Sequence, residues 1–162
     1  MEKTGSLWSY VARFALVHVI TYAVIAIAFL AFQGALPAQG RAALDFFAPY
    51  RPLNLITLAG QIIRGGFLAL ILYPFYDLIV RGRRGGLVLF AALWGLALLG
   101  SVEPMPGSIE GVIYTETTAA EHLVALAAGA VQALLFAWLF LSWERRSGAD
   151  RDAHRAGSVN HG

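Results

Sequence analysis

The chain has 162 residues, of which 58% are hydrophobic and 14% charged, with a formal net charge of +2 and no cysteine. A soluble domain averages about 45–50% apolar and about 25% charged residues, so a soluble domain of this length would have too little polar surface to cover its core. The composition excludes a soluble enzyme, a disordered chain, a disulfide scaffold and any thiolate-bound metal or haem, and it indicates an integral membrane protein.

Four apolar stretches follow one another along the chain, and each is a candidate transmembrane helix. A helix needs about 20 predominantly apolar residues to cross a bilayer. The stretches cover residues 7–32, 55–80, 87–102 and 119–143, and the third is short for a span. The sequence therefore predicts an all-α fold, with a bundle of four transmembrane helices over residues 1–146. The small, polar and charged residues 147–162 predict a disordered tail.

Basic residues are distributed unevenly between the two sides of the predicted bundle. Lys3, Arg13, the turn 81–84 and the tail lie on one side, whereas the opposite loops carry only Arg41 and Arg51. Cytoplasmic loops of membrane proteins are enriched in lysine and arginine. We therefore expect a multi-pass protein of a plasma or bacterial inner membrane, with both termini in the cytoplasm.

The opposite, outer side is acidic. Glu103, Glu110 and Glu121 lie there, and His122 follows directly after Glu121. One explanation is that lysine and arginine are retained on the cytoplasmic side during membrane insertion, so that the outer loops simply lack them. The other is that the outer loops form an acidic mouth that concentrates cations or basic ligands. The connection 103–116 is rich in proline and glycine, which is typical both of an ordered cap over this mouth and of a plain surface loop.

Linker length and small residues predict how the helices pack. The short linker between the second and third stretches predicts that these two helices are antiparallel neighbours. Small residues at four-residue spacing allow close helix packing in lipid. They are Gly65 and Ala69, then Ala91 and Gly95, then Ala125, Gly129 and Ala133. We expect these stripes to close the bundle, or to pair copies in a homo-oligomer, rather than to line a pore.

Five polar side chains fall near the middle of three predicted spans, when depth is counted from the helical rise of about 1.5 Å per residue. They are His18, Tyr22, Gln61, Arg64 and Gln132. Ionisable and polar groups are costly in hydrocarbon, so they are the first candidates for a functional site. We expect them to form a buried polar layer that binds or moves a small solute or lipid.

Arg64 and His18 each allow more than one role. Arg64 pairs with Glu121 across two helices, or it awaits an anionic small molecule or lipid headgroup that fits its planar guanidinium, or it extends to water. His18 is a hydrogen-bonded structural group or a proton carrier. A haem held by His18 and His122 is disfavoured because His122 lies about 15 Å higher by the helical rise. We expect no cofactor and no metal.

The cytoplasmic end of the second stretch reads Tyr73-Pro74-Phe75-Tyr76-Asp77. Pro74 removes a helical hydrogen bond, so we expect a kink there. Asp77 forms a local ion pair with the basic turn that follows, or it joins Tyr73 and Tyr76 in an inner gate.

The chain carries no known catalytic motif, so the sequence does not select one function. We consider three functional hypotheses. The first is a membrane protein that binds or transports a small solute or lipid through the polar layer. The second is an accessory subunit of a larger membrane complex. The third is an intramembrane enzyme that uses Glu121, His122 and Arg64 on a lipid. The bilayer is the expected partner in each case, and nothing indicates nucleic acid.

Overall fold

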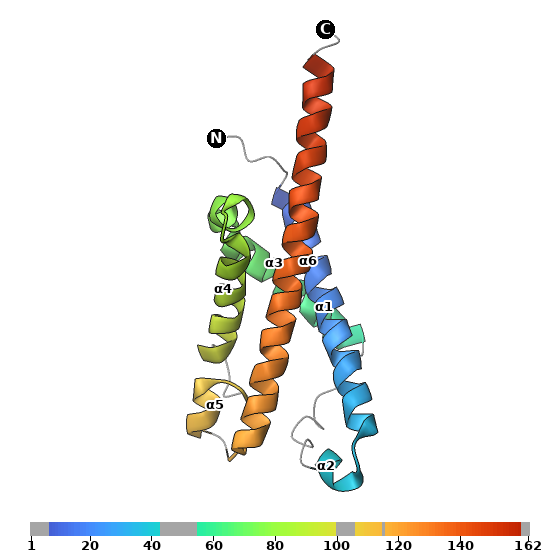
Figure 1. Cartoon of the computed structure of the whole chain (residues 1–162), viewed down its shortest axis with the longest axis vertical. Helices are drawn as coiled ribbons and strands as arrows, with labels where there is room; N and C mark the ends of the chain where they lie inside the picture. Colours follow the sequence, from blue (N-terminus) through green and yellow to red (C-terminus); the bar gives the residue numbers. More distant parts are fainter. Residues whose placement is uncertain (1–6, 43–54, 100–105, 115, 160–162) are drawn as a thin grey trace.

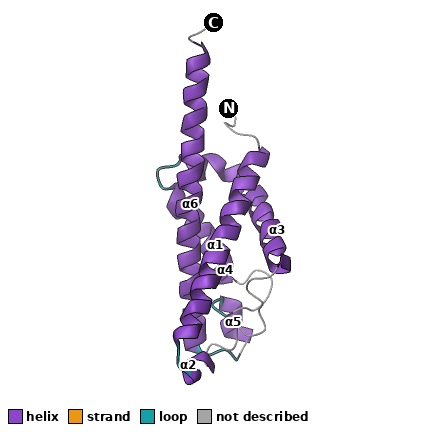
Figure 2. Cartoon of the chain, turned by 90° about the vertical axis from the view of Figure 1, so that its right-hand side faces the viewer, coloured by secondary structure: helices purple, strands orange, loops and turns teal. Residues whose placement is uncertain are grey.

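The computed structural model describes residues 7–42, 55–99, 106–114 and 116–159, and it is helical with no strand over these ranges (Figures 1 and 2). Its longer helices are α1 (Leu7–Ala35), α3 (Leu55–Leu72), α4 (Gly85–Leu99) and α6 (Ala119–Val159). Two short helices, α2 (Ala38–Ala42) and α5 (Ile109–Tyr114), lie at the end of the molecule away from the termini (Figure 1).

Three helical segments are long and apolar enough to cross a membrane, namely Leu7–Ala35, Leu55–Phe75 and Ala119–Ala149. α4 has only 15 residues. At about 1.5 Å per residue it is about 22 Å long, which is shorter than the roughly 30 Å hydrocarbon core of a bilayer. The predicted all-α class is confirmed, and spanning length is confirmed for three of the four stretches.

The helices pack in the order α3, α1, α6, α4. α1 contacts both α3 and α6, and α4 packs on α6. Within the described residues α3 and α4 make at most marginal contact, and of the predicted second helix only the end, Asp77–Arg81, packs on α4, so the predicted pairing is wrong for α3.

The connection between α3 and α4 explains why they separate. The chain leaves α3 through a 3-10 turn, Tyr73–Phe75, and a π-helical turn, Asp77–Arg81. Pro74 cannot donate a helical hydrogen bond, and each change of helix type alters the direction of the chain. The helix is thus interrupted at Pro74, where a kink was predicted, and residues 73–84 carry the chain from α3 to α4, which packs on α6 (Figure 1).

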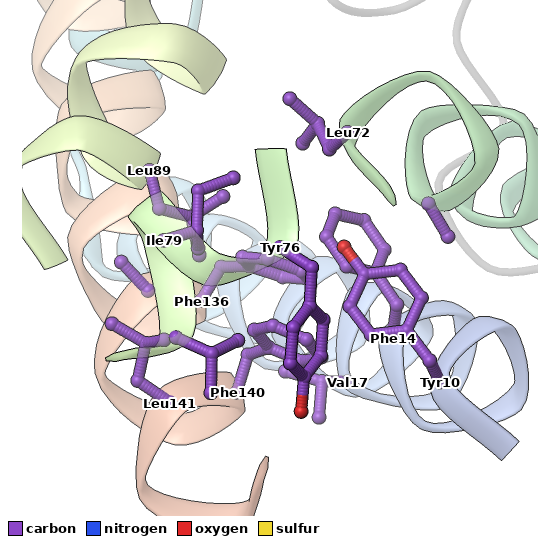
Figure 3. Close-up of a cluster of buried hydrophobic side chains, with 13 residues drawn as sticks. Tyr10, Phe14, Val17, Leu72, Tyr76, Ile79, Leu89, Phe136, Phe140 and Leu141 are labelled. Carbon is purple, nitrogen blue, oxygen red and sulfur yellow. The ribbon is translucent and has the colours of Figure 1, made fainter. Parts of the chain in front are cut away.

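A packed aromatic core joins α1, α6 and the link between α3 and α4 (Figure 3), and the parts of α1 and α6 that form it lie towards the termini in Figure 1. The ring centroids of Phe14 and Phe136 are 4.6 Å apart, and those of Tyr10 and Phe140 are 5.5 Å apart. The core cluster contains no residue of α1 beyond Val17. From there towards α5 the helices diverge (Figure 1).

α6 continues as one helix to Val159 and projects beyond the bundle, whereas the composition predicts disorder from Ser147 (Figure 1). Extending a helix that has already formed avoids the cost of nucleation. Alanine and arginine, which recur over this segment, are good helix formers. Low apolar content therefore does not prevent a helix that grows out of a packed one.

Candidate functional site

A partly open cavity of about 700 Å³ lies among α1, α3, α4 and α6. Sites for small molecules measure about 300–1,000 Å³. All members of the predicted polar layer line this cavity: His18, Tyr22, Gln61, Arg64 and Gln132. The remaining wall is mainly apolar and includes Leu68 of α3, Trp94 of α4 and Phe136 of α6.

A glycine brings α3 against α1 beside the cavity. A Cβ atom on Gly65 would lie 2.9 Å from Cα of Ala15 and 3.1 Å from Cβ of His18, so no larger residue fits there without movement. Gly65 and Ala69 are both buried, as predicted for a stripe that closes the bundle. The close approach lets Nε2 of His18 donate a hydrogen bond to Oε1 of Gln61 at 3.0 Å.

Thr21 is a lining residue that the sequence analysis did not select. It is completely buried, and its hydroxyl donates to the carbonyl oxygens of Val17 and His18 at 3.0 and 3.1 Å. A threonine satisfied within its own helix gives no sign in the sequence that it faces a cavity. The sequence could have indicated it only through its position three residues after His18, which places both residues on the same face of the helix.

The predicted ion pair between Arg64 and Glu121 is absent from the described residues. Glu121 instead accepts hydrogen bonds from the backbone nitrogen and the hydroxyl of Thr118, at 2.6 and 2.8 Å. This is a capping box, in which a threonine and a glutamate three residues later satisfy the free amides at a helix start. Arg64 is exposed, and within the described chain it has neither a hydrogen bond nor an ion pair.

His122 also serves a local structural purpose. Its Nδ1 accepts a hydrogen bond from the backbone nitrogen of Gly107 at 2.9 Å, and Gly107 has a positive φ of 88°, which favours glycine. Ser108 then caps α5 by accepting from the backbone nitrogen of Gly111 at 2.9 Å. Part of the predicted outer cap is thus an ordered helix held to α6. Glu110 lies in its first turn, and Glu103 lies outside the described residues.

The small-residue stripe of α6 faces the cavity. Ala125, Gly129 and Ala133 all line it, and a Cβ atom on Gly129 would meet no atom within 4 Å. The stripe was predicted to close the bundle or to pair copies of the chain, and within the described residues it closes the bundle only in part, since Ala133 is buried whereas Gly129 meets open space. The physical reason is that α3 stays beside α1 and makes at most marginal contact with α6.

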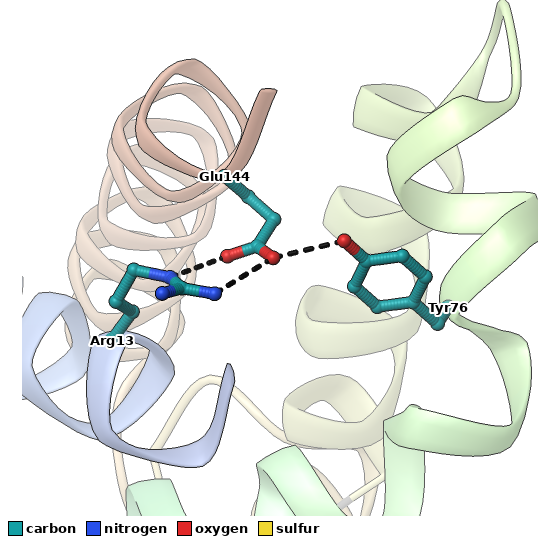
Figure 4. A network of polar contacts seen from close by, with 3 residues as sticks. All are labelled: Arg13, Tyr76 and Glu144. Carbon is teal, nitrogen blue, oxygen red and sulfur yellow. Dashed lines mark hydrogen bonds and ion pairs between the residues drawn. The ribbon is translucent and has the colours of Figure 1, made fainter. Parts of the chain in front are cut away.

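A buried ionic network lies near the other end of the helices, and the sequence analysis missed it (Figure 4). Glu144 is only 1% exposed and accepts hydrogen bonds from Nε and Nη2 of Arg13, at 2.6 and 2.9 Å, and from the hydroxyl of Tyr76, at 2.9 Å. The neighbouring Arg145 donates to the carbonyl oxygens of Val80 and Gly82. The network joins α1, α6 and the link between α3 and α4.

The three residues of the predicted inner end have separate roles. Asp77 forms the predicted local ion pair, with Arg81, at 3.0 Å. Tyr76 reaches Glu144 (Figure 4), and the ring of Tyr73 packs on Tyr10 with centroids 5.4 Å apart. The tyrosines belong to the closed, packed half of the bundle.

The cavity lining restricts the chemistry that this site can perform. Neither Glu121 nor His122 lines the cavity, so the pair that the enzyme hypothesis needs is separated from Arg64. The described residues also contain no group of three or more histidine, aspartate or glutamate side chains arranged to hold a metal. The cavity lining combines one arginine with several hydrogen-bonding groups and apolar walls.

No protein-family model matches this chain, and comparison with curated proteins and with solved structures gave no match either. The functional argument therefore depends on the residues of the cavity.

Proposed function

We propose that this chain is a small multi-pass membrane protein that binds a small anionic ligand in the cavity among α1, α3, α4 and α6. Arg64 carries the proposal. It lines the cavity and has no acidic partner among the described residues. A cation within a membrane span is costly unless it is paired or hydrated. A carboxylate or phosphate would supply the missing partner, because either group accepts two hydrogen bonds from a guanidinium.

Hydrogen-bonding capacity on the opposite wall supports the same proposal. Gln132 of α6 lines the cavity and makes no hydrogen bond within the described chain. Its amide both donates and accepts, so it suits an oxygen-rich headgroup. His18 and Gln61 already bond to each other, and they position α3 so that Arg64 reaches the same space.

The closed half of the bundle favours binding over free passage. The aromatic core (Figure 3) and the Arg13–Glu144–Tyr76 network (Figure 4) involve the parts of α1 and α6 nearer the termini. A ligand in the cavity thus meets packed side chains on that side. If the protein also transports its ligand, this half must open.

The distribution of arginine supports an orientation with both termini in the cytoplasm. The contacts of Arg13 with Glu144 and of Arg145 with Val80 and Gly82 bring the start of α1, the turn before α4 and the later part of α6 to one end of the molecule. Further arginines follow in the sequence of this turn and of the later part of α6. Basic residues concentrate on the cytoplasmic side and attract anionic lipid headgroups there.

Native mass spectrometry of the protein purified in a mild detergent tests the proposed function. We expect the unsubstituted protein to retain a defined small-molecule mass that Arg64→Gln loses. Removing one charged partner from a hydrogen-bonded ion pair costs about 1.5–3 kcal/mol, which is about 10–150-fold in affinity. Arg83→Gln is the matched control, because Arg83 is exposed in the turn before α4 and does not line the cavity.

A protein that carries no small molecule, or one whose bound mass is unaffected by Arg64→Gln, contradicts the proposal. A second protein retained in fixed stoichiometry instead supports the alternative of an accessory subunit in a larger complex. The same spectrum counts the copies of the chain and so tests the expected homo-oligomer.

A further inference from the structure

We infer that the ligand is a single-chain amphiphile with an anionic headgroup, and that it enters the cavity sideways from the bilayer between α3 and α4. This inference rests on the proposed function, because it names the class of ligand for the same site. It is drawn from the way the four helices surround the cavity, from the charge of the lining and from the size of the space.

The seam between α3 and α4 is the open side of the cavity. Around the cavity, α3 packs on α1, α1 on α6 and α6 on α4. Both α3 and α4 contribute lining residues, yet within the described chain they make at most marginal contact with each other. Figure 2 shows α3 slanting away from the other long helices.

Hydrocarbon surrounds this seam when the helices are in a membrane. Phe67 of α3 is 64% exposed, and Leu96 of α4 is both part of the lining and 43% exposed. Large apolar side chains on the outside of apolar helices contact lipid tails. A molecule passing through the seam therefore comes from the lipid phase, and an acyl chain moves from one apolar environment into another.

The lining combines one positive charge with apolar walls. Arg64 is charged, and no aspartate or glutamate of the described chain lines the cavity. Leu68, Leu93 and Leu126 are among the apolar residues of the lining. An anionic headgroup beside Arg64 with an alkyl chain against the leucines satisfies both parts, whereas a small soluble anion leaves the leucine walls without a partner.

The volume favours one chain over two. A space of about 700 Å³ lies within the range of about 300–1,000 Å³ that accepts drug-sized ligands. One acyl chain with a carboxylate or phosphate head is of that size, and a phospholipid with two chains is larger.

Trp94 provides a probe inside the cavity. It lines the space, and its indole nitrogen lies 3.5 Å from the carbonyl oxygen of Leu126 on α6. The other tryptophans, Trp8, Trp138 and Trp143, do not line it, so replacing them with phenylalanine leaves Trp94 as the single emitter. Bromine atoms on a bound chain quench tryptophan fluorescence at short range.

The experiment uses this single-tryptophan protein in bilayers of a zwitterionic lipid at pH 9, where a carboxylic acid is ionised. We expect dibromostearate to quench Trp94 saturably, and the alcohol with the same brominated chain to require at least tenfold more. Arg64→Gln should weaken quenching by dibromostearate at least tenfold. Arg64→Lys, which keeps the charge, should retain part of the effect, and Arg83→Gln should not change it.

Equal quenching by the acid and the alcohol, or no effect of Arg64→Gln in a protein with unchanged helical content, overturns the inference. Equal saturable quenching by a two-chain brominated phospholipid overturns the single-chain assignment. If butyrate or inorganic phosphate competes with dibromostearate at equal concentration, the amphiphile is wrong while the proposed anion site stands. If none of these anions binds, both proposals fall.

Discussion

Two arginines within the candidate spans have opposite surroundings. Arg13 is 15% exposed and forms two hydrogen bonds with the buried carboxylate of Glu144, whereas Arg64 lines a cavity and has no acidic partner in the described chain. A buried charge is tolerated when a partner and further hydrogen bonds compensate for lost hydration. The first arginine is therefore structural, and the second lacks such compensation within the described chain, which is why we propose that it binds a ligand.

The Arg13–Glu144 pair gives a prediction at the residue scale. Glu144→Ala leaves the guanidinium of Arg13 without its partner, which we expect to lower the free energy of unfolding by about 3–5 kcal/mol. Tyr76→Phe removes one hydrogen bond to a charged acceptor and should cost about 1.5–3 kcal/mol. Denaturant titration in detergent micelles, followed by circular dichroism, measures both losses.

The double variant Arg13→Leu/Glu144→Leu is the control for this prediction. Because it removes both charges together, its stability should lie closer to that of the unsubstituted protein than the stability of Glu144→Ala does. If the double variant loses as much stability as the single one, the pair does not behave as a compensated buried ion pair.

At the scale of elements, the contact between α1 and α3 determines where the polar groups of the cavity meet. Gly65 allows the two backbones to approach, and the His18–Gln61 hydrogen bond lies beside that contact. The turns after Pro74 then turn the chain away, so α4 reaches α6 rather than α3. The cavity is the space between α3, which packs on α1, and α4, which packs on α6.

Neighbouring glycines test this description. Gly65→Ala places a methyl group 2.9 Å from Cα of Ala15, and we expect this overpacking to cost about 1–3 kcal/mol. In Gly66→Ala the nearest atom, Cγ1 of Val11, is 4.0 Å away, so this change should be neutral or stabilising through the better helix propensity of alanine. Thermal unfolding of both variants in one detergent gives the comparison, and equal melting temperatures would contradict the close contact.

At the scale of the whole molecule, the structure is closed at the end that holds the termini and open towards α5. The aromatic core (Figure 3) and the ionic network lie towards the end that holds the termini, and the cavity lies on the side of α5 (Figure 1). In the proposed orientation, with the termini in the cytoplasm, the closed half would face the cell interior. The proposed ligand site would then be accessible from the bilayer and from the outer half only.

The lack of cysteine makes this orientation directly measurable. Single cysteines at Ala149, in the later part of α6, and at Glu116, near the opposite end, are both at exposed positions. In intact cells a membrane-impermeant maleimide should label Glu116→Cys and leave Ala149→Cys unlabelled until the membrane is opened. The reverse pattern would show that the basic end of the molecule faces outward.

The sequence by itself determined the helical class, the three long apolar helices, the break at Pro74 and the ion pair between Asp77 and Arg81. Each of these follows from local physics, namely the length of an apolar run, a missing amide or a contact four residues away. The sequence also selected the polar residues that line the cavity, because depth along a helix is proportional to residue count.

Only the tertiary structure decided which helices are neighbours and which face of each is covered. A helix that is apolar on nearly all sides does not mark its buried face, so the stripe of Ala125, Gly129 and Ala133 could equally have met another helix or a cavity. The pairing of Arg13 with Glu144 across 131 positions depends on the same choice of neighbours. Packing among all four helices sets that choice, and no local segment of the chain contains it.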